Sequence, residues 1–453
     1  MVKKKKNIDY NKLYLQKRQA EIDSIKKTII NNKVHIVDNT LNKKYNSISS
    51  NSWFDIKKYT DDKVKNKKKY QIINKKLTKC KTILLEFSSQ QKELLDKWFT
   101  SFILMYNQTI NFFKKRKFNK ESCITNWKKI RSNHLKTIRD KIQKESKIDN
   151  DNRTEIRAHM LDYAIKLASS NYKSALTNLR KGNIKHFRLR YWRHNKDNKI
   201  IDFEKGSIKN NNMCKIGNIK AFYNGKKFDL TVDSDCRLQY DSVLNIYQLF
   251  IPEKVNSNIN NIKKNDFLGI DLGIRKFVSG VSNNEAIKIG TNVISILRKY
   301  IRRKNKINNN NKINKKIKKK NENLCRRKIK NLVSDLHWKV IKYITSNYNT
   351  IYIGDMSAKQ IVNNKTSTLT GEIKEIALNL GIYKFRQRLE FKCEQENVKY
   401  KLINERFTTK MCCKCGWVNE EIGKKEIFNC KECGMKEDRD INSASIISIK
   451  NRI

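Results

Sequence analysis

The sequence of 453 residues predicts a multidomain α+β protein, in which helices interrupt a small antiparallel sheet or barrel and an α/β unit follows. Three observations predict this organisation. Apolar residues recur at three-to-four spacing over residues 93–185, whereas residues 186–262 alternate between turns. Beyond residue 263, apolar strands alternate with helical segments, which is typical of an α/β unit, and paired cysteines follow.

The composition points to a polyanionic partner. Lys and Arg number 100 against 44 Asp and Glu, a formal net charge of +56 whose self-repulsion is costly without a counter-charge. Nucleic acid is the expected partner, and a membrane surface is the competing one. No apolar run approaches the roughly 18 residues of a membrane span, so we expect no membrane and an intracellular protein. Eleven cysteines, an odd number, favour a reducing compartment and metal over disulfides.

The N-terminal part is the least patterned. Residues 1–80 are a basic extension for which a disordered tail is the simpler interpretation, and Lys3–Lys6 is alternatively a nuclear address or a phosphate-binding arm. Asp9–Ile30 is predicted to include a helix. Residues 81–92 contain a first strand at Lys81–Phe87, which we expect to complete the later sheet across the helical segment.

A helical domain over residues 93–185 and a β-domain over residues 186–262 follow. The predicted strands of the β-domain are Ile219–Tyr223, Lys227–Val232, Cys236–Tyr240 and Ile246–Ile251. The segment His186–His194 interleaves cations with aromatic rings, a mixture that can hold a nucleic-acid backbone and stack bases. Its candidate residues are Arg188, Arg190, Tyr191, Trp192 and Arg193. An amphipathic strand with a basic outer face is the alternative.

The α/β unit spans residues 263–408 and resumes at residues 437–453. Its first strand, F-L-G-I-D-L-G, carries Asp271 within an apolar run, and such an acid is costly unless it binds metal or is hydrogen-bonded. We favour a metal-binding carboxylate. A second strand, I-Y-I-G-D, ends at Asp355. Between them, residues 298–330 predict a basic insertion of two helices joined at Asn308–Asn311, which taken alone is usually a solvated face.

Residues 409–436 predict a zinc ribbon. Cys412/Cys415 and Cys430/Cys433 form two Cys-x-x-Cys turns fourteen residues apart, slightly closer than the usual template, and four thiolates suit tetrahedral Zn²⁺. Glu405 precedes the ribbon and Asp438 and Asp440 follow it, so the ribbon can bring distant acids together. Solvated acids beside a purely structural ribbon are the alternative.

These motifs resemble those of TnpB-like nucleases, the transposon-associated relatives of type V CRISPR effectors. The resemblance covers roughly residues 80–450 and rests on these stretches in order: F-L-G-I-D-L-G-I, K-N-L-V-S-D-L-H-W-K, I-Y-I-G-D, G-I-Y-K-F-R-Q-R-L-E-F-K, T-T-K-M-C-C-K-C-G and D-R-D-I-N-S-A. It implies an antiparallel β-barrel (wedge) with an inserted helical recognition lobe. It also implies an RNase H-like (RuvC) nuclease domain interrupted by the zinc ribbon.

The resemblance further implies an RNA-guided, Mg²⁺-dependent DNA endonuclease with Asp271, Glu405 and Asp440 as its catalytic and magnesium-binding acids. Two Mg²⁺ ions would serve the nuclease site, and the zinc would be structural. Bacterial TnpB has a glutamate where this chain has Asp355, whereas the eukaryotic and large-virus branch, Fanzor, uses a later one, which Glu405 matches. Asp440 is preferred over Asp438 because the family acid directly precedes the x-Asn-small-Ala stretch.

The implied partners are a guide RNA from the mobile element and target double-stranded DNA beside a short flanking motif. The protein is expected to be a monomer that works in the nucleus or wherever viral or mobile-element DNA resides. Two alternatives remain: a nuclease-dead nucleic-acid-binding regulator, which would lack the acids, and a DNA transposase, which would need strand transfer.

Overall fold

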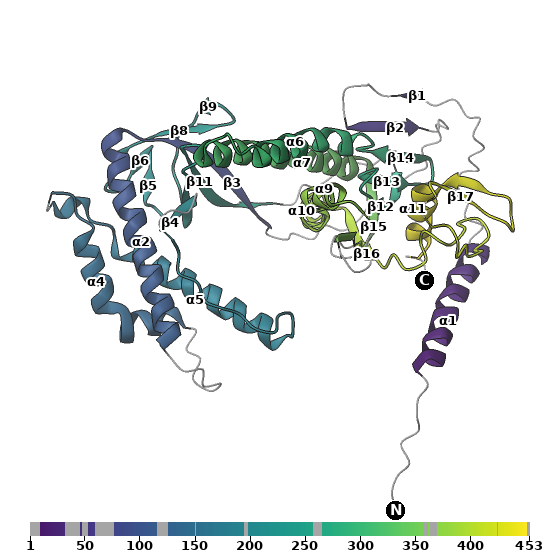
Figure 1. Cartoon of the computed structure of the whole chain (residues 1–453), viewed down its shortest axis with the longest axis horizontal. Helices are drawn as coiled ribbons and strands as arrows, with labels where there is room; N and C mark the ends of the chain where they lie inside the picture. Colours follow the sequence, from purple (N-terminus) through teal and green to yellow (C-terminus); the bar gives the residue numbers. More distant parts are fainter. Residues whose placement is uncertain are drawn as a thin grey trace, which may run out of the picture. The chain divides into compact units, whose positions relative to one another are not determined.

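The computed structural model separates into two compact units, formed by residues 1–77 with 256–453 and by residues 78–255 (Figure 1). The structure describes residues 10–31, 46–47, 53–58, 77–115, 126–149, 151–193, 198–256, 265–356, 361–362, 369–423 and 425–450. The α/β unit and the β-domain of the sequence prediction fall in different units, with the predicted helical segment in the second.

The first unit is built on a seven-stranded mixed sheet with the strand order β1-β2-β14-β13-β12-β15-β16. β12, β15 and β16 are parallel, so their carboxyl ends meet at one edge, and β13 runs antiparallel to β12. The strands are β1 Asn46–Ser47, β2 Phe54–Lys58, β12 Asn265–Leu272, β13 Val278–Val281, β14 Glu285–Ile289, β15 Tyr348–Gly354 and β16 Lys399–Ile403.

Helices cover both faces of this sheet. Because side chains alternate along a strand, Leu268 and Ile270 of β12 enter the core shared with α7 and α10, whereas Gly269 meets α11 on the other face. The helices are α6 Val293–Asn309, α7 Lys315–Asn347, α9 Gly371–Leu380, α10 Ile382–Gln395 and α11 Arg439–Lys450. Asp271 has the same parity as Gly269 and therefore lies on the α11 face.

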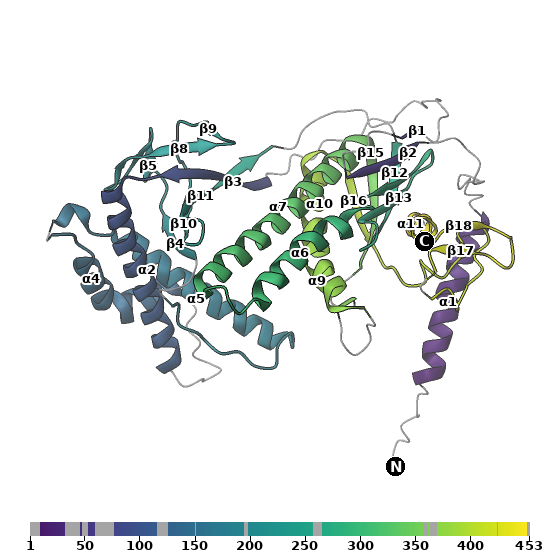
Figure 2. The ribbon, with the colours of Figure 1, turned by 45° about the horizontal axis from the view of Figure 1, so that its top comes forward.

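The predicted basic insertion forms a helical hairpin, as expected. α6 and α7 lie side by side and are joined by a turn near Asn310 (Figure 2). α7 runs without a break from the basic tract to the start of β15. At about 1.5 Å per residue its 33 residues are much longer than the seven-residue strand that follows. The first half of α7 therefore extends past the edge of the sheet where β12 and β15 end.

The N-terminal extension is more ordered than its composition suggested. The predicted helix is present as α1 (Tyr10–Asn31), and its Ile22, Ile25 and Ile29 pack in a cluster with ribbon and α11 side chains. β2 adds a strand to the sheet by pairing with β14. A disordered tail is therefore wrong for these segments, because three isoleucines at helical spacing give a polar helix one apolar side. Lys3–Lys6 lies outside the described residues.

The second unit contains a six-stranded sheet with the order β4-β10-β11-β3-β8-β9. β3 lies between β11 and β8, so the strand before the helices does complete the later sheet, as predicted. The strands are β3 Leu77–Glu86, β4 Asn198–Phe203, β8 Lys220–Tyr223, β9 Lys226–Lys227, β10 Cys236–Asp241 and β11 Ile246–Val255. The described strands end at β4 and β9, so this sheet is open where a closed barrel was expected.

Short turns explain this difference from the predicted barrel. A separate three-stranded sheet holds β5 Ile208–Lys209, β6 Asn212–Met213 and β7 Gly217–Asn218, and these two-residue strands are separated by left-handed residues such as Asn210 and Lys215. The predicted strand Lys227–Val232 is mostly irregular. Frequent reversals of the backbone leave too few consecutive extended residues to close a barrel.

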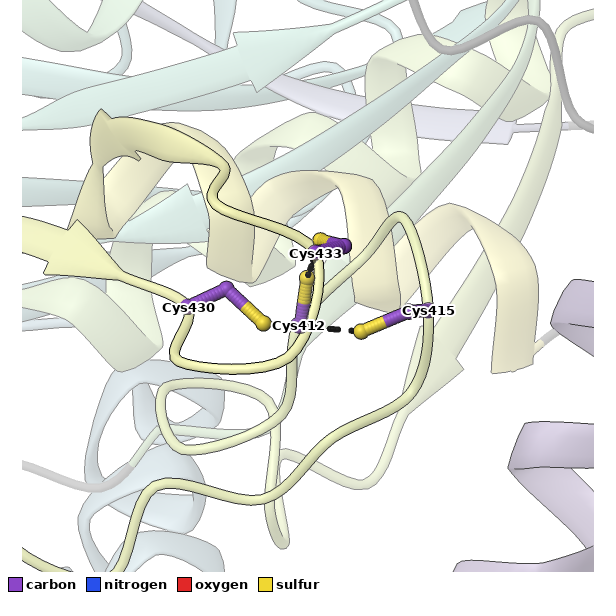
Figure 3. Close-up of side chains that lie close together, drawn as sticks. All are labelled: Cys412, Cys415, Cys430 and Cys433. Carbon is purple, nitrogen blue, oxygen red and sulfur yellow. Dashed lines mark hydrogen bonds between the residues drawn. The ribbon is translucent and has the colours of Figure 1, made fainter.

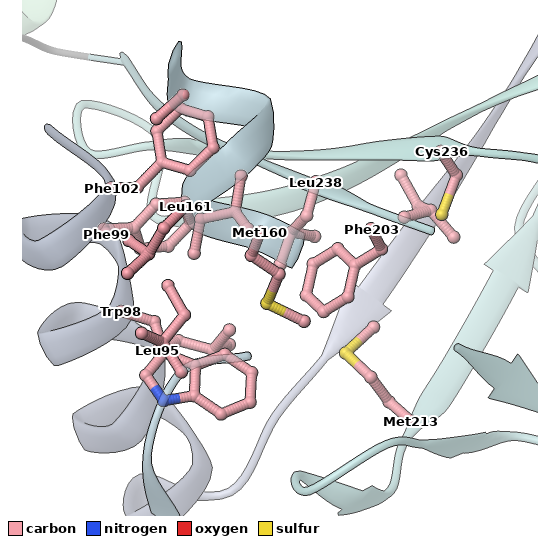
Figure 4. Close-up of a cluster of buried hydrophobic side chains, with 14 of the residues drawn as sticks. Leu95, Trp98, Phe99, Phe102, Met160, Leu161, Phe203, Met213, Cys236 and Leu238 are labelled. Carbon is pink, nitrogen blue, oxygen red and sulfur yellow. The ribbon is translucent and has the colours of Figure 1, made fainter. Parts of the chain in front are cut away.

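The helices of this unit form one core with the sheet (Figure 4). Leu95, Trp98, Phe99 and Phe102 on α2 face Met160 and Leu161 on α5, together with strand residues such as Phe203 and Leu238. The helices are α2 Ser89–Lys115, α3 Trp127–Ile130, α4 Lys136–Glu145 and α5 Ala158–Arg180, with the short helical turns Arg131–Leu135 and Asn152–Thr154. No helix in the described ranges is both long and apolar enough to cross a membrane.

Candidate active site

Asp271 lies near the end of β12, at the edge where the parallel strands finish. A glycine two residues earlier sets the distance to α11, because a Cβ at Gly269 would lie 2.4 Å from the carbonyl oxygen of Ala444. Only a residue without a side chain lets the helix approach the strand so closely. The L-G-I-D sequence thus places Asp271 beside the first turn of α11.

Glu405 reaches the same place from the end of β16. The register that pairs Ile270 with Ile353 sets Asp271 level with Gly354 on the neighbouring parallel strand. A Cβ built on Gly354 would lie 1.8 Å from Oε1 of Glu405, so the glutamate side chain lies directly over this glycine. Oε1 is buried and has no hydrogen-bond partner among the described residues. Gly354 therefore makes room for a carboxylate next to Asp271.

Asp355 has a different environment from Glu405. Its side chain is exposed, and its Oδ1 accepts a hydrogen bond of 3.1 Å from the backbone N–H of Glu405. Arg386 of α10 donates to the carbonyl oxygens of Gly354 and Met356, at 3.2 and 2.9 Å, and fixes the backbone on either side of Asp355. Asp355 thus holds the backbone from which the glutamate extends.

Asp440 and Asp438 also differ in what they contact. Oδ1 of Asp438 accepts from the backbone N–H of Asp440 at 3.0 Å and caps the start of α11, while its Oδ2 is 2.6 Å from Nζ of Lys276 and 2.8 Å from Nζ of Lys288. Burial raises the pKa of Asp438, but hydrogen bonds from the two lysines outweigh it and leave this pKa lowered. Asp440 meets Lys276 at a longer 3.3 Å and Arg439 at 3.2 Å.

Electrostatics link the three predicted acids. Burial, then the charge of Glu405, then that of Asp440, raise the pKa of Asp271 well above its usual value, and a hydrogen bond from Ser443 opposes them. Burial raises the pKa of Glu405 to about 7, with a backbone hydrogen bond at Met356 opposing and Asp355 adding to the rise. Burial and the like charges near Asp271 favour the binding of a hard divalent cation by its carboxylate.

The four predicted zinc ligands converge in the ribbon (Figure 3). All four sulfur atoms lie within 4.8 Å of one another. Sγ of Cys412 is 3.7 Å from that of Cys433, and Sγ of Cys415 is 3.5 Å from that of Cys430. Zn–S bonds of about 2.3 Å in a tetrahedron separate sulfurs by about 3.8 Å, so the cluster can hold a zinc ion.

The ribbon is joined rigidly to the acids that flank it. The buried Asn442 of α11 accepts from the backbone N–H of Cys413 at 2.9 Å and donates to the carbonyl of Met411 at 2.7 Å. The hydroxyl oxygens of Ser443 and Thr408 are 3.0 Å apart, and the Thr408 hydroxyl donates to the backbone carbonyl of Glu405 at 2.9 Å. These contacts were not foreseen. The sequence does hold a signal for these contacts in its I-N-S-A stretch. Asn442 and Ser443 are polar residues that follow Asp440 within one helical turn, and both are buried.

The predicted nucleic-acid segment lies in the second unit. Residues 187–193 pair with no described strand; Arg188, Arg190 and Arg193 point outward, while Trp192 is partly buried and packs edge-on against Tyr106. Asn107 holds the Trp192 backbone through two hydrogen bonds of 2.7 and 2.9 Å. The cations and Tyr191 are thus available to a ligand, whereas the tryptophan serves the core.

Fold and site together define a mixed α/β protein in which a four-cysteine ribbon lies between Glu405 and Asp440 in the sequence. Among the described residues, only these four cysteines bring three or more metal-binding side chains within 4.8 Å of one another. Family models match at two places: "Probable transposase" over residues 250–365 and "Cas12f1-like, TNB domain" over residues 383–447. A solved structure titled "Cryo-EM structure of the Cas12f1-sgRNA-target DNA complex" aligns with a TM-score of 0.32 and 17% identity, covering 83% of this chain and 99% of that one.

Curated relatives identify the family. The chain is 30% identical over 452 residues to TnpB-like protein R854 of Acanthamoeba polyphaga mimivirus, covering 90% of this chain and 83% of the relative. It is equally similar to TnpB-like protein L770 of the same virus, over 449 residues, with 90% and 84% covered. The chain therefore belongs to the TnpB-like family, which confirms the resemblance seen in its motifs.

Proposed function

We propose that this chain is an RNA-guided DNA endonuclease of the Fanzor type, whose catalytic acids are Asp271, Glu405 and Asp440. The observation that carries the proposal is the position of the Glu405 carboxylate over Gly354, level with Asp271 on the neighbouring strand. Relatedness to Cas12f1 of Sulfoacidibacillus thermotolerans, described as a CRISPR-associated endodeoxyribonuclease and 28% identical over 113 residues, supports it. On this proposal, the first unit is a RuvC-like nuclease domain and the second combines a recognition lobe with a wedge.

The three acids are proposed to hold Mg²⁺, since carboxylate oxygens suit that ion and Glu405 presents a buried oxygen with no hydrogen-bond partner among the described residues. Bound Mg²⁺ would activate water and stabilise the leaving oxygen in phosphodiester hydrolysis. The chain's own residues orient this donor set. β12 fixes Asp271, the Asp355 carboxylate fixes the backbone of Glu405, and the capped first turn of α11 fixes Asp440.

Lys276 has a positioning part in this proposal. Its ammonium group lies between Asp438 and Asp440, at 2.6 and 3.3 Å, and is thereby held at the border of the acid cluster. A cation in this place limits the repulsion felt by a phosphodiester that approaches three carboxylates. The ribbon zinc would be structural, since sulfur fills all four positions.

The proposed partners are a guide RNA from the mobile element and double-stranded DNA, bound by a monomer in the nucleus or at viral DNA. In the first test, the gene is expressed together with the DNA that flanks it in its native element. The protein is then purified, and any RNA that copurifies with it is sequenced. Guided cleavage of plasmid DNA is then compared for wild type and Asp271→Asn. We expect the variant to lose at least a thousandfold in rate while binding the same RNA; cleavage within tenfold of wild type would remove Asp271 from the site.

A DNA transposase is the second candidate, favoured by the "Probable transposase" model over residues 250–365. It predicts joined products between an element end and a target, whereas the nuclease predicts only cut ends. Incubating the protein with both DNAs and amplifying across any new junction distinguishes the two. Junctions that depend on Asp271 would favour the transposase.

A further inference from the structure

The outer surface of α7 and α10, on the opposite face of the sheet from α11, carries aromatic rings in the open. Trp338 is 44% exposed and Tyr383 is 67% exposed, although side chains of this size usually serve a core or an interface. The guanidinium of Arg388 lies over the Trp338 ring, 5.1 Å from its centre. The flat surfaces of a ring and a guanidinium are thus presented together at the protein surface.

Arg388 is held in place by a buried histidine. Nε2 of His337 is 2.8 Å from the carbonyl oxygen of Leu380, so this nitrogen carries the proton and Nδ1 accepts from Arg388 at 3.2 Å. His337 stacks on Phe277 at 5.3 Å, which fixes its ring plane. Burial lowers the pKa of His337 to about 4, so the ring stays neutral and can accept. The arginine is therefore oriented before any ligand arrives.

The cations around Trp338 differ from their neighbours in their ion pairing. In the part of the chain that the structure describes, Lys330, Lys384 and Arg388 form no ion pair, whereas nearby Lys339 pairs with Asp335 at 2.9 Å. Burial, then Arg388, then Lys330, lower the pKa of Lys384. Like charges held close together without a counter-ion are relieved when an anion binds among them.

We propose that Trp338, Lys330, Lys384 and Arg388 form a binding platform for single-stranded nucleic acid. The cations take a backbone phosphate, and an unpaired base stacks on the Trp338–Arg388 pair. Aromatic and arginine planes both stack bases, and a base within a duplex is already stacked on its neighbours. The inference rests on the proposed function for its choice of nucleic acid, which the net charge of +56 favours over an acidic protein.

The platform lies on the opposite face of the sheet from α11, and α10 connects it to the catalytic edge. α10 carries Arg388 two residues after Arg386, which holds the backbone of Gly354 and Met356 beside the candidate acids. Lys330 belongs to the half of α7 that extends past the catalytic edge of the sheet. A backbone that follows α7 from its basic end therefore meets Lys330 before Trp338.

Photochemical cross-linking tests the platform without using cleavage. The full-length protein is irradiated with oligo-dT carrying 5-iododeoxyuridine, with the equivalent 5-iodouridine RNA, and with a duplex of the same DNA; adducts are located by mass spectrometry. We expect adducts at Trp338 with a single-stranded probe, and the stronger of the two probes identifies DNA or RNA. No adduct at Trp338, or equal yield from the duplex, would overturn the proposal.

Variants then test the phosphate contacts. Lys384→Ala and Arg388→Ala should each lower the adduct yield at least fivefold, and Trp338→Phe should keep phosphate-dependent binding because it retains a ring. Lys339→Ala is the matched control: it removes the same charge from a neighbouring but paired lysine and should change the yield less than twofold. An equal loss in this control would overturn the proposal. If the protein cleaves guided DNA but gives no adducts at the platform, only the platform is refuted. If adducts form but no DNA is cleaved, only the proposed nuclease function is refuted.

Discussion

The substitution Gly354→Ala tests whether the position of Glu405 matters. A single methyl group at this position would lie 1.8 Å from Oε1 of Glu405 and 2.6 Å from its Cγ and Cδ. Ordinary contact begins near 3.4 Å, so the carboxylate would have to move by about 1.6 Å. Misplacing a catalytic group by about 1 Å can cost roughly a hundredfold in rate. We therefore expect guided DNA cleavage to fall a hundredfold or more, with RNA binding unchanged.

The assay compares single-turnover cleavage by wild type, Gly354→Ala and Gly371→Ala with saturating guide and target. Gly371 is the matched control, since it belongs to the same unit and a Cβ there meets nothing within 4 Å. Thermal melting of each variant separates local displacement from unfolding. If Gly354→Ala cleaves within threefold of the control while folded, the placement of Glu405 over this glycine is not needed, and the reasoning about the acid cluster fails.

Three further outcomes are expected. Glu405→Gln should abolish cleavage while Asp355→Asn keeps measurable activity, as read from the same assay; the reverse order would return the catalytic role to Asp355. Cys415→Ser should release the zinc of the purified protein and lower activity, whereas Cys413→Ala should keep it, both followed by elemental analysis; wild-type protein without zinc would contradict this. Affinity for guide RNA should fall at least about a thousandfold between 50 and 200 mM salt, because many phosphate contacts release counterions; a flat response would assign the positive charge another role.

Local sequence patterns were sufficient to predict those features that depend on the spacing of neighbouring residues. The two Cys-x-x-Cys turns predicted the sulfur cluster, and the apolar strand around Asp271 holds a half-buried acid whose metal-binding role stays a prediction. The strand at residues 81–87 was correctly joined to the later sheet, although its observed start, Leu77, lies four residues earlier. In each case a few neighbouring residues determine the local structure.

Contacts between distant segments could not be read in this way. α1 docks on the ribbon through a hydrophobic cluster that contains Ile25 and Met411, and no local pattern links those positions. The role of Gly354 becomes visible only when Glu405, fifty-one residues later, is seen to lie over it. The open sheet of the second unit could not be predicted for the same reason. Which strands pair with one another depends on contacts between segments that are distant in the sequence.

Asp355 and Glu405, fifty residues apart, have different roles at the edge of this sheet. Asp355 directly follows β15 and has an exposed side chain, and its carboxylate accepts a hydrogen bond from the backbone N–H of Glu405 at 3.1 Å. A carboxylate engaged in this way orients the chain that enters the ribbon. Glu405, with one methylene more, extends over Gly354 to the position level with Asp271 on the next strand. A shorter acid at the strand end and a longer one before the ribbon are therefore complementary, since the first fixes the backbone from which the second reaches the proposed metal site.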